Sequence, residues 1–151
     1  RHPVTVVLGA DIERLEPLVG TTPARVAFNP DHAQGMASSI RVGLAQAPSD
    51  ARGALIALAD QVAVTADDLR QLVSRWEQHP DRIVAAQYEG TIGVPAIFPA
   101  DLFRELAELQ GDRGARVLLS RYPERVIGVP MPSAAQDIDT PADLSVSTLS
   151  V

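Results

Sequence analysis

Two acidic segments, far apart in the sequence, carry the residues best suited to bind a metal ion. Asp60 and Gln61 directly follow the most apolar run in the chain, residues 53–59. Asp137 and Asp139 alternate in the second segment, so their side chains share one face if the backbone there is extended. Carboxylates from distant segments suit Mg²⁺, which takes oxygen ligands and keeps several waters. The alternative is structural: Asp60 ends a strand, and the second pair precedes a helix whose dipole favours acidic residues.

Two glycine-containing segments have residues that could bind anions. Residues 35–39, Gly-Met-Ala-Ser-Ser, place a glycine and hydroxyl groups where a helix begins, and N–H groups there could hold an anion or the edge of a base. Residues 111–116, Gly-Asp-Arg-Gly-Ala-Arg, form a turn into a helix, and their guanidinium groups suit phosphate or carboxylate. Ordinary helix capping and a surface turn with exposed arginines are the structural alternatives.

The composition excludes several kinds of chemistry. The 151 residues contain no cysteine, and all 13 basic residues are arginine. Thiolate metal sites, thiol nucleophiles, Schiff bases and a P-loop lysine are therefore ruled out within this stretch. The formal net charge of -6 argues against binding to nucleic-acid backbones, although a mononucleotide site can use Mg²⁺ and backbone N–H groups instead. No apolar run is long enough to cross a membrane and no signal peptide is visible, so we expect a cytoplasmic protein that binds neither nucleic acid nor membranes.

Strand-like and helix-like segments alternate along the chain. Short β-branched or apolar runs predict strands at residues 4–8, 25–28, 53–59, 83–88, 92–98 and 126–129. Apolar residues at helical spacing predict helices at residues 12–19, from Ser38 or Ser39 to Ala45, from Thr65 through Trp76, at 102–109, at 115–122 and after Thr140.

This alternation predicts an α/β fold, a three-layer Rossmann-like sandwich around a mostly parallel sheet. The run 53–59 is apolar on both faces, which favours a central strand covered by helices on each side. In such sheets ligands bind at the carboxyl ends of the strands, where Asp60 is expected to lie. No linker or repeat interrupts the pattern, so we expect a single domain over residues 1–151.

Five segments, in this order, resemble those of the molybdenum-cofactor nucleotidyltransferases, especially the cytidylyl-transferring branch of the MobA-like NTP transferases. They are Asn29-Pro30 with Gly35 to Ile40 and Gly43-Leu44, then Leu58 to Gln61, Gly93 to Phe98, Leu109 to Arg116, and Asp137 to Leu144. Together they extend over almost the whole chain. The resemblance implies a Rossmann-like sandwich of the nucleotide-diphospho-sugar transferase type.

The resemblance also implies an activity: Mg²⁺-dependent transfer of a nucleotide, with CTP favoured over GTP, to a molybdopterin-type cofactor, with release of pyrophosphate. Asp60 is then the catalytic and metal-binding residue, with Asp139 and Asp137 as the second acidic position. A molybdoenzyme, or the chaperone of one, is a candidate partner. The residues implied at the nucleotide are Asn29, Gly35, Ser38 and Ser39, and those at the acceptor are Gly111, Asp112, Gly114 and Arg116.

The sequence departs from this family pattern in two places. Val62 stands where the family usually has proline, a change that alters a turn and keeps the metal ligand. The family also opens with a strand and a Gly-rich loop carrying Arg and Lys, and residues 1–151 begin after that point. We therefore expect this stretch to be the C-terminal part of a nucleotidyltransferase domain, with a missing strand between the strands at Val4 and Gly53. By itself it should bind nucleotide poorly and turn over little or nothing.

Two other functions fit the same residues. The first is a nucleotidyltransferase with another substrate pair, such as guanylyl transfer or transfer to a sugar phosphate. The second is a non-catalytic α/β module that helps deliver the cofactor to a molybdoenzyme, a reading that the lack of the Gly-rich loop and lysine favours.

Overall fold

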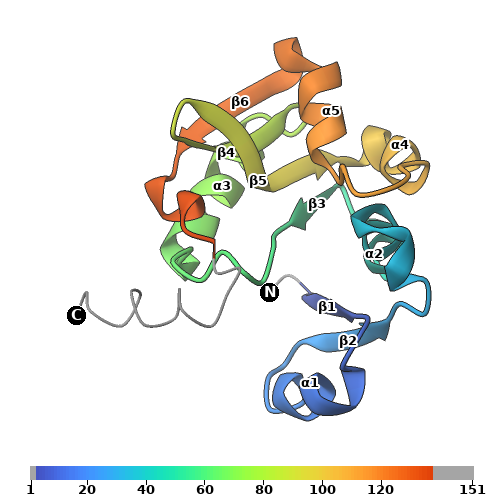
Figure 1. The fold of residues 1–151 in the computed structure, drawn as a ribbon. Helices are drawn as coiled ribbons and strands as arrows, with labels where there is room; N and C mark the ends of the chain where they lie inside the picture. Colours follow the sequence, from blue (N-terminus) through green and yellow to red (C-terminus); the bar gives the residue numbers. More distant parts are fainter. Residues whose placement is uncertain (1–2, 138–151) are drawn as a thin grey trace. The chain divides into compact units, whose positions relative to one another are not determined.

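The computed structural model describes residues 3–137. In chain order the elements are β1 (Thr5–Leu8), α1 (Ile12–Val19), β2 (Arg25–Phe28), η1 (His32–Gln34), α2 (Met36–Leu44), β3 (Gly53–Ile56), α3 (Ala66–Gln78), β4 (Ile83–Tyr88), β5 (Thr91–Pro99), η2 (Ala100–Leu102), α4 (Phe103–Ala107), α5 (Arg116–Arg121), η3 (Pro123–Arg125), β6 (Val126–Pro130) and η4 (Pro132–Ala135), where η denotes a 3-10 helix. They form two compact units (Figure 1). The first unit comprises residues up to 54 together with 100–118, and the second comprises 55–99 together with the residues from 119 on.

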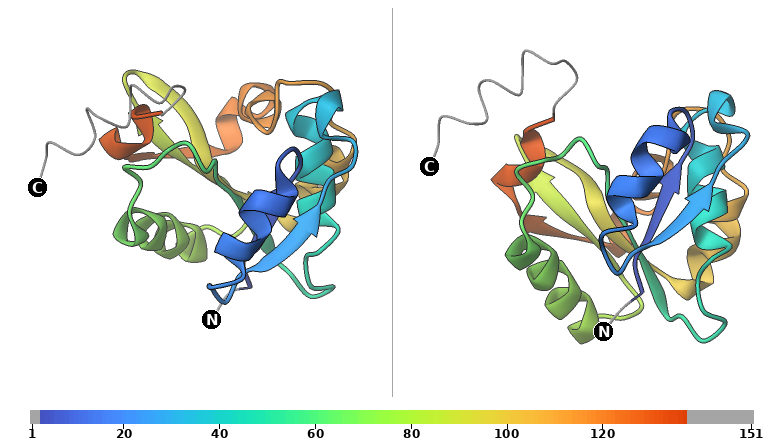
Figure 2. Two further views of the ribbon diagram at one scale, coloured as in Figure 1. Left: turned by 60° about the horizontal axis from the view of Figure 1, so that its bottom comes forward. Right: turned by 90° about the horizontal axis from the view of Figure 1, so that it is seen from below.

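The first unit is built on a parallel pair of short strands. β1 and β2 pair from Thr5 opposite Arg25 to Leu8 opposite Phe28, and their valines favour the extended backbone. Helices α1 and α2 both contact this pair, and Figure 2 shows α1 running alongside it. The buried apolar side chains of the unit come from β1, β2, α2 and the segment 102–118: Leu8, Ala27, Ala37, Ile40, Leu102, Leu106, Leu109, Ala115 and Leu118.

The second unit is built on a sheet with the strand order β3-β5-β4-β6. β4 and β5 form an antiparallel hairpin around Glu89 and Gly90, which both have positive φ as a tight two-residue turn requires. β6 runs parallel to β4 (Figure 1). Leu72 and Trp76 of α3 are buried in a cluster with Ile97 and other sheet residues, so the apolar stripe of α3 faces the sheet.

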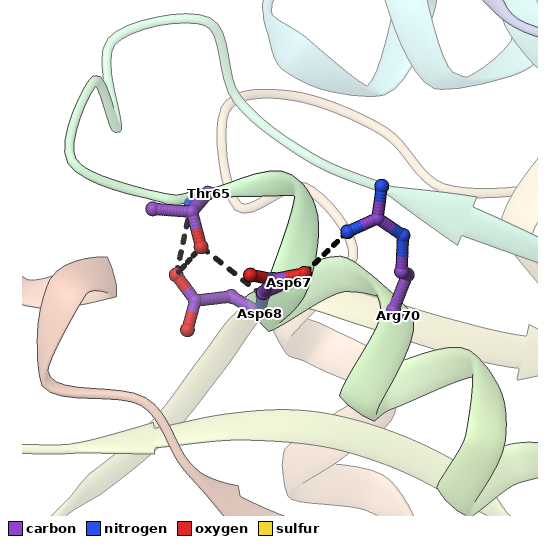
Figure 3. Close-up of polar contacts among 4 residues, drawn as sticks. All are labelled: Thr65, Asp67, Asp68 and Arg70. Carbon is purple, nitrogen blue, oxygen red and sulfur yellow. Dashed lines mark hydrogen bonds and ion pairs between the residues drawn. The ribbon is translucent and has the colours of Figure 1, made fainter.

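A capping box begins α3, as Figure 3 shows. The Thr65 hydroxyl accepts a hydrogen bond from the Asp68 backbone N–H at 3.2 Å, and Asp68 Oδ2 accepts one from the Thr65 backbone N–H at 2.8 Å. On the exposed side of the same turn, Asp67 forms an ion pair with Arg70. The start of α3 at Ala66, capped by Thr65, therefore agrees with the helix predicted from Thr65 onward.

The α/β class predicted from the sequence is confirmed, with a mixed sheet in the second unit because β5 runs antiparallel to β4. The prediction of a central strand over residues 53–59 is wrong for the described chain. β3 ends at Ile56 and stands at one end of the strand order, and Leu55 is 37% exposed. An edge strand has only one neighbour to complete its hydrogen-bond ladder, which allows it to be short.

β1 and β3 belong to different sheets, and each leaves an apolar side chain near its edge exposed, Val4 at 59% and Leu55 at 37%. The single-domain organisation, and the further strand expected between these two strands, stay predictions. Across residues 3–137, none of the helices combines the length and the apolar character needed to cross a bilayer.

Candidate functional site

Asp60 lies in the turn that follows β3 and has a buried oxygen with no partner. No hydrogen-bond donor within residues 3–137 reaches its Oδ1 atom, although that atom is shielded from solvent. A buried carboxylate oxygen without a donor is unfavourable, because it has lost its hydrogen bonds to water and the protein supplies none to replace them. A cation or a donor-bearing ligand would supply the missing interaction. The residue therefore fits the metal-binding role predicted for it.

Sequence reasoning assigns Gln61 no role, yet its side chain is the more deeply buried of the two, with 5% of its surface exposed. Its Nε2 atom donates to the Val94 carbonyl at 3.0 Å and to the Ala134 carbonyl at 2.9 Å. Its Oε1 atom is buried and lacks a donor in the described chain. The available signal was a polar residue next to Asp60 at the end of an apolar run.

Asp137 follows η4, and its side chain is exposed. Gln61 contacts Ala134, three residues before Asp137, so the structure brings the chain leading to Asp137 to the turn that carries Asp60. Asp139, the other predicted metal ligand, lies outside the described residues. Nowhere in residues 3–137 do three His, Cys, Asp or Glu side chains gather, so a metal site here would rely on one or two carboxylates and water, as Mg²⁺ sites do.

The predicted nucleotide residues Asn29, Ser38 and Ser39 form one hydrogen-bonded group in the first unit. Asn29 is fully buried, and its Nδ2 donates to Ser38 Oγ at 2.8 Å and to Ser39 Oγ at 3.0 Å. Ser38, itself 2% exposed, donates to the Gly35 carbonyl at 2.8 Å. Asn29 and Ser38 thus hold the loop before α2 in shape. Ser39, in contrast, keeps a hydroxyl proton that no acceptor in the described chain takes.

Gly35 brings the predicted nucleotide and acceptor segments together. It precedes α2 with φ 99°, where L side chains are rarely found, and a Cβ there would collide with Asp112 Oδ1 and come within 2.7 Å of the Gly111 backbone. The Ala37 N–H, in the first turn of α2, donates to the Gly111 carbonyl at 3.1 Å. No serine side chain caps this helix. Helix α2 begins at Met36, earlier than the serine cap predicted.

The remaining acceptor candidates differ in their surroundings. Gly114 is buried, and a Cβ on it would lie 2.5 Å from the sulfur of Met36, so this glycine also packs tightly on the start of α2. Arg116 opens α5 with an exposed side chain. The segment 111–114 is therefore placed against the Gly35 loop, with Arg116 following it on the surface.

A polar cavity of about 580 Å³ lies beside this segment, lined by Gln34, Arg41 and residues 107–111. Arg41 is half-buried, and its Nη1 donates to the Leu109 carbonyl at 2.6 Å. No ion pair joins Arg41 to a carboxylate among the described residues, whereas Glu108 on the same rim pairs with Arg104 at 3.0 Å. The unused donors of Arg41 make the cavity suitable for a phosphate or carboxylate group.

The chain matches the family model of the MobA-like NTP transferase domain over residues 2–126. It is 33% identical over 150 residues to nicotine blue oxidoreductase of Paenarthrobacter nicotinovorans, covering 92% of this chain and 72% of that protein. The structure of Rv0371c from Mycobacterium tuberculosis H37Rv, in complex with manganese, is similar at 28% identity and a TM-score of 0.78, over 99% of this chain and 78% of that one. A nucleotidyl transferase from Methanothermobacter shares the fold at 23% identity and a TM-score of 0.77, over 96% of this chain and 71% of that one.

The family match extends over most of the sequence and includes the Asn29, Gly35, Asp60 and Gly111 segments described above. The protein therefore belongs to the MobA-like NTP transferase domain family and is a nucleotidyltransferase domain.

Proposed function

We propose that this protein transfers CMP from CTP to a molybdopterin-type cofactor in a Mg²⁺-dependent reaction that releases pyrophosphate. The observation that carries the proposal is the buried, unpartnered Oδ1 of Asp60 in the turn after β3, within a domain of the NTP transferase family. The manganese bound by the related Mycobacterium tuberculosis protein supports the use of a divalent cation.

Asp60 and Asp137 would hold the ion, together with Asp139 from the segment outside the described residues. When bound, Mg²⁺ would neutralise charge on the triphosphate and on the α-phosphoryl group as it is transferred. A bond forms between an acceptor phosphate oxygen and the α-phosphorus, the bond from the α-phosphorus to the bridging oxygen breaks, and pyrophosphate leaves. The contribution of the protein is to position these groups.

The first unit contains the residues that we propose to bind the nucleotide and the acceptor. Ser39 and the Gly35 loop would contact the nucleotide, with Asn29 and Ser38 keeping the loop rigid. The cavity at Arg41 would take the acceptor phosphate, because its guanidinium group has spare donors and Gly111 lies on its rim.

The decisive experiment uses the full-length protein and measures pyrophosphate release with CTP or GTP, the molybdenum cofactor and Mg²⁺. It compares the wild type with Asp60→Asn. The substitution keeps the volume and removes the charge, so we expect a loss of about a hundredfold or more. Asp50→Asn, an equal charge change at an exposed loop position, should retain wild-type turnover. Full activity in Asp60→Asn would contradict the proposal, and faster release from GTP would assign guanylyl transfer instead.

A second candidate activity is oxidoreduction, favoured by the 33% identity to nicotine blue oxidoreductase. Oxidation or reduction of nicotine blue with an added redox partner, without any pyrophosphate release from CTP, would favour it. Activity with neither substrate set, combined with tight binding to a molybdoenzyme, would favour a cofactor-delivery module.

A further inference from the structure

The orientation of the Gln61 side-chain amide is fixed by its contacts. Two carbonyl oxygens, from Val94 at 3.0 Å and Ala134 at 2.9 Å, lie within hydrogen-bond distance of one end of the amide. Only the NH₂ group can donate to both, so this end is Nε2 and the other is Oε1. With 5% of its surface exposed, the side chain has little freedom to choose another arrangement.

These two bonds join three segments of the second unit. Gln61 follows Asp60 directly, Val94 belongs to β5, and Ala134 belongs to η4. Asp137 is only three residues beyond Ala134, a stretch that spans at most about 11 Å even when fully extended. Gln61 therefore limits how far Asp137 can lie from the turn of Asp60.

Two further hydrogen bonds hold η4 and the residue before it against other elements. Met131, which precedes it, is 1% exposed and its N–H donates to the Gln87 carbonyl at 2.8 Å. Ser133 Oγ donates to Asp68 Oδ2 at 2.9 Å. Neither of these contacts reaches the Asp60 turn, whereas Gln61 links η4 to that turn by a side-chain hydrogen bond.

The Oε1 atom of Gln61 makes no hydrogen bond in the described chain, which is unusual for a buried residue with a purely structural role. Oε1 is buried and lacks a donor in the described chain, as does Oδ1 of its neighbour Asp60. A residue retained only to hold the fold together would be expected to have both ends satisfied, because a buried acceptor without a donor is destabilising. Two such acceptors on consecutive residues leave this turn able to take a cation or a hydrogen-bond donor from a ligand.

We propose that Gln61 is a positioning residue of the metal site: its amide holds the segment leading to Asp137 against the turn that carries Asp60. This inference rests on the proposed function, in which Asp60 and Asp137 bind the ion. It assigns Gln61 an effect on metal affinity that acts through Asp137 and not through the stability of the fold.

A double-mutant cycle on the 151-residue chain tests this coupling, with Mn²⁺ titrated as the probe and its binding followed by electron paramagnetic resonance. Gln61→Met removes the amide at similar length and should weaken Mn²⁺ binding about tenfold. In an Asp137→Asn background the same change should have an effect of about twofold or less, because the carboxylate it positions is gone. Gln71→Met, the same substitution at an exposed position on α3, should leave Mn²⁺ affinity unchanged.

Thermal unfolding of each variant separates the outcomes. If Gln61→Met lowers Tm but leaves Mn²⁺ affinity unchanged, or weakens binding equally in both backgrounds, Gln61 does not act through Asp137 and the inference is overturned. Should Gln61→Met fail to fold, Gln61→Asn keeps the amide on a shorter side chain and is expected to show the same pattern. Wild-type Mn²⁺ affinity in both Asp60→Asn and Asp137→Asn would instead remove the proposed metal site itself.

Discussion

At the scale of single residues, a polar residue can matter for a loop without touching a ligand. The resemblance groups Asn29, Ser38 and Ser39 as nucleotide-binding, but the structure gives them different surroundings. Asn29 and Ser38 are buried and use their polar groups on each other and on the backbone of Gly35. Ser39 accepts one bond from Asn29 and is only half-buried. Their roles at the nucleotide stay a prediction, and substitution can separate them.

The change Ser38→Ala should reduce stability, and Ser39→Ala should reduce nucleotide binding. Removing the Ser38 hydroxyl leaves the buried Asn29 amide short of an acceptor, which we expect to lower the free energy of unfolding by about 1–3 kcal/mol. Ser39→Ala also removes an acceptor of the Asn29 amide, but Ser39 is only half-buried, so water can take the place of its hydroxyl. It should lower the free energy of unfolding by less than about 1 kcal/mol while raising KM for CTP of the full-length protein several-fold. Urea denaturation and steady-state kinetics on the two variants measure both quantities. Equal loss of stability in the two variants with unchanged KM would show that both serines are structural.

At the scale of elements, the start of α3 combines a local capping box with a hydrogen bond from a residue far along the chain. The Thr65 and Asp68 capping box could be predicted, because its partners are three residues apart. The bond from Ser133 to Asp68 could not, because η4 lies far along the chain. The Thr65 backbone N–H lowers the pKa of Asp68, partial burial opposes this, and the hydroxyls of Thr65 and Ser133 lower it further.

This lowered pKa predicts acid sensitivity at α3. The folded-state pKa of Asp68 lies below its unfolded value near 3.8, so its stabilising contribution is complete above that pH and is lost as the pH falls through the folded-state value. Asp68→Asn should therefore flatten the decline in the free energy of unfolding between about pH 5 and pH 2. Urea denaturation across this range provides the measurement. Asp67→Asn, next to it on the exposed side, should keep the wild-type pH profile, and an identical profile in Asp68→Asn would refute the assignment.

Elements with local signals were predicted well, and those decided by distant contacts were not. α1 over Ile12–Val19 and the hairpin around Glu89-Gly90 agree with the sequence pattern. β3 is shorter than its apolar run, because its extent depends on which strands pair with it. α2 begins at Met36 because Gly111 accepts the hydrogen bond from Ala37, a contact that local spacing does not reveal.

At the scale of the whole molecule, the predicted site residues divide between the two compact units. Asp60 and Asp137, with Gln61, belong to the second unit, and the Gly35 and Gly111 segments belong to the first. The order of motifs in the sequence predicted site roles for Asp60, Asp137, Gly35 and Gly111, and these roles stay predictions, whereas it gave no role to Gln61. The hydrogen bonds that organise the groups, from Gln61 to Ala134 and from Asn29 to Ser38, required the structure.

This division predicts where a metal ion alone will change the dynamics of the protein. Mn²⁺ or Mg²⁺ should slow hydrogen exchange in segments around Gln61 and η4, because a ligand stabilises the local structure that binds it. Without nucleotide, the loop at Gly35 should exchange at its metal-free rate, since none of the proposed metal ligands lies in the first unit. Exchange mass spectrometry with and without a chelator provides the measurement, and Asp60→Asn should abolish the protection. Protection confined to the Gly35 loop would place the ion in the first unit and contradict the assignment of Asp60.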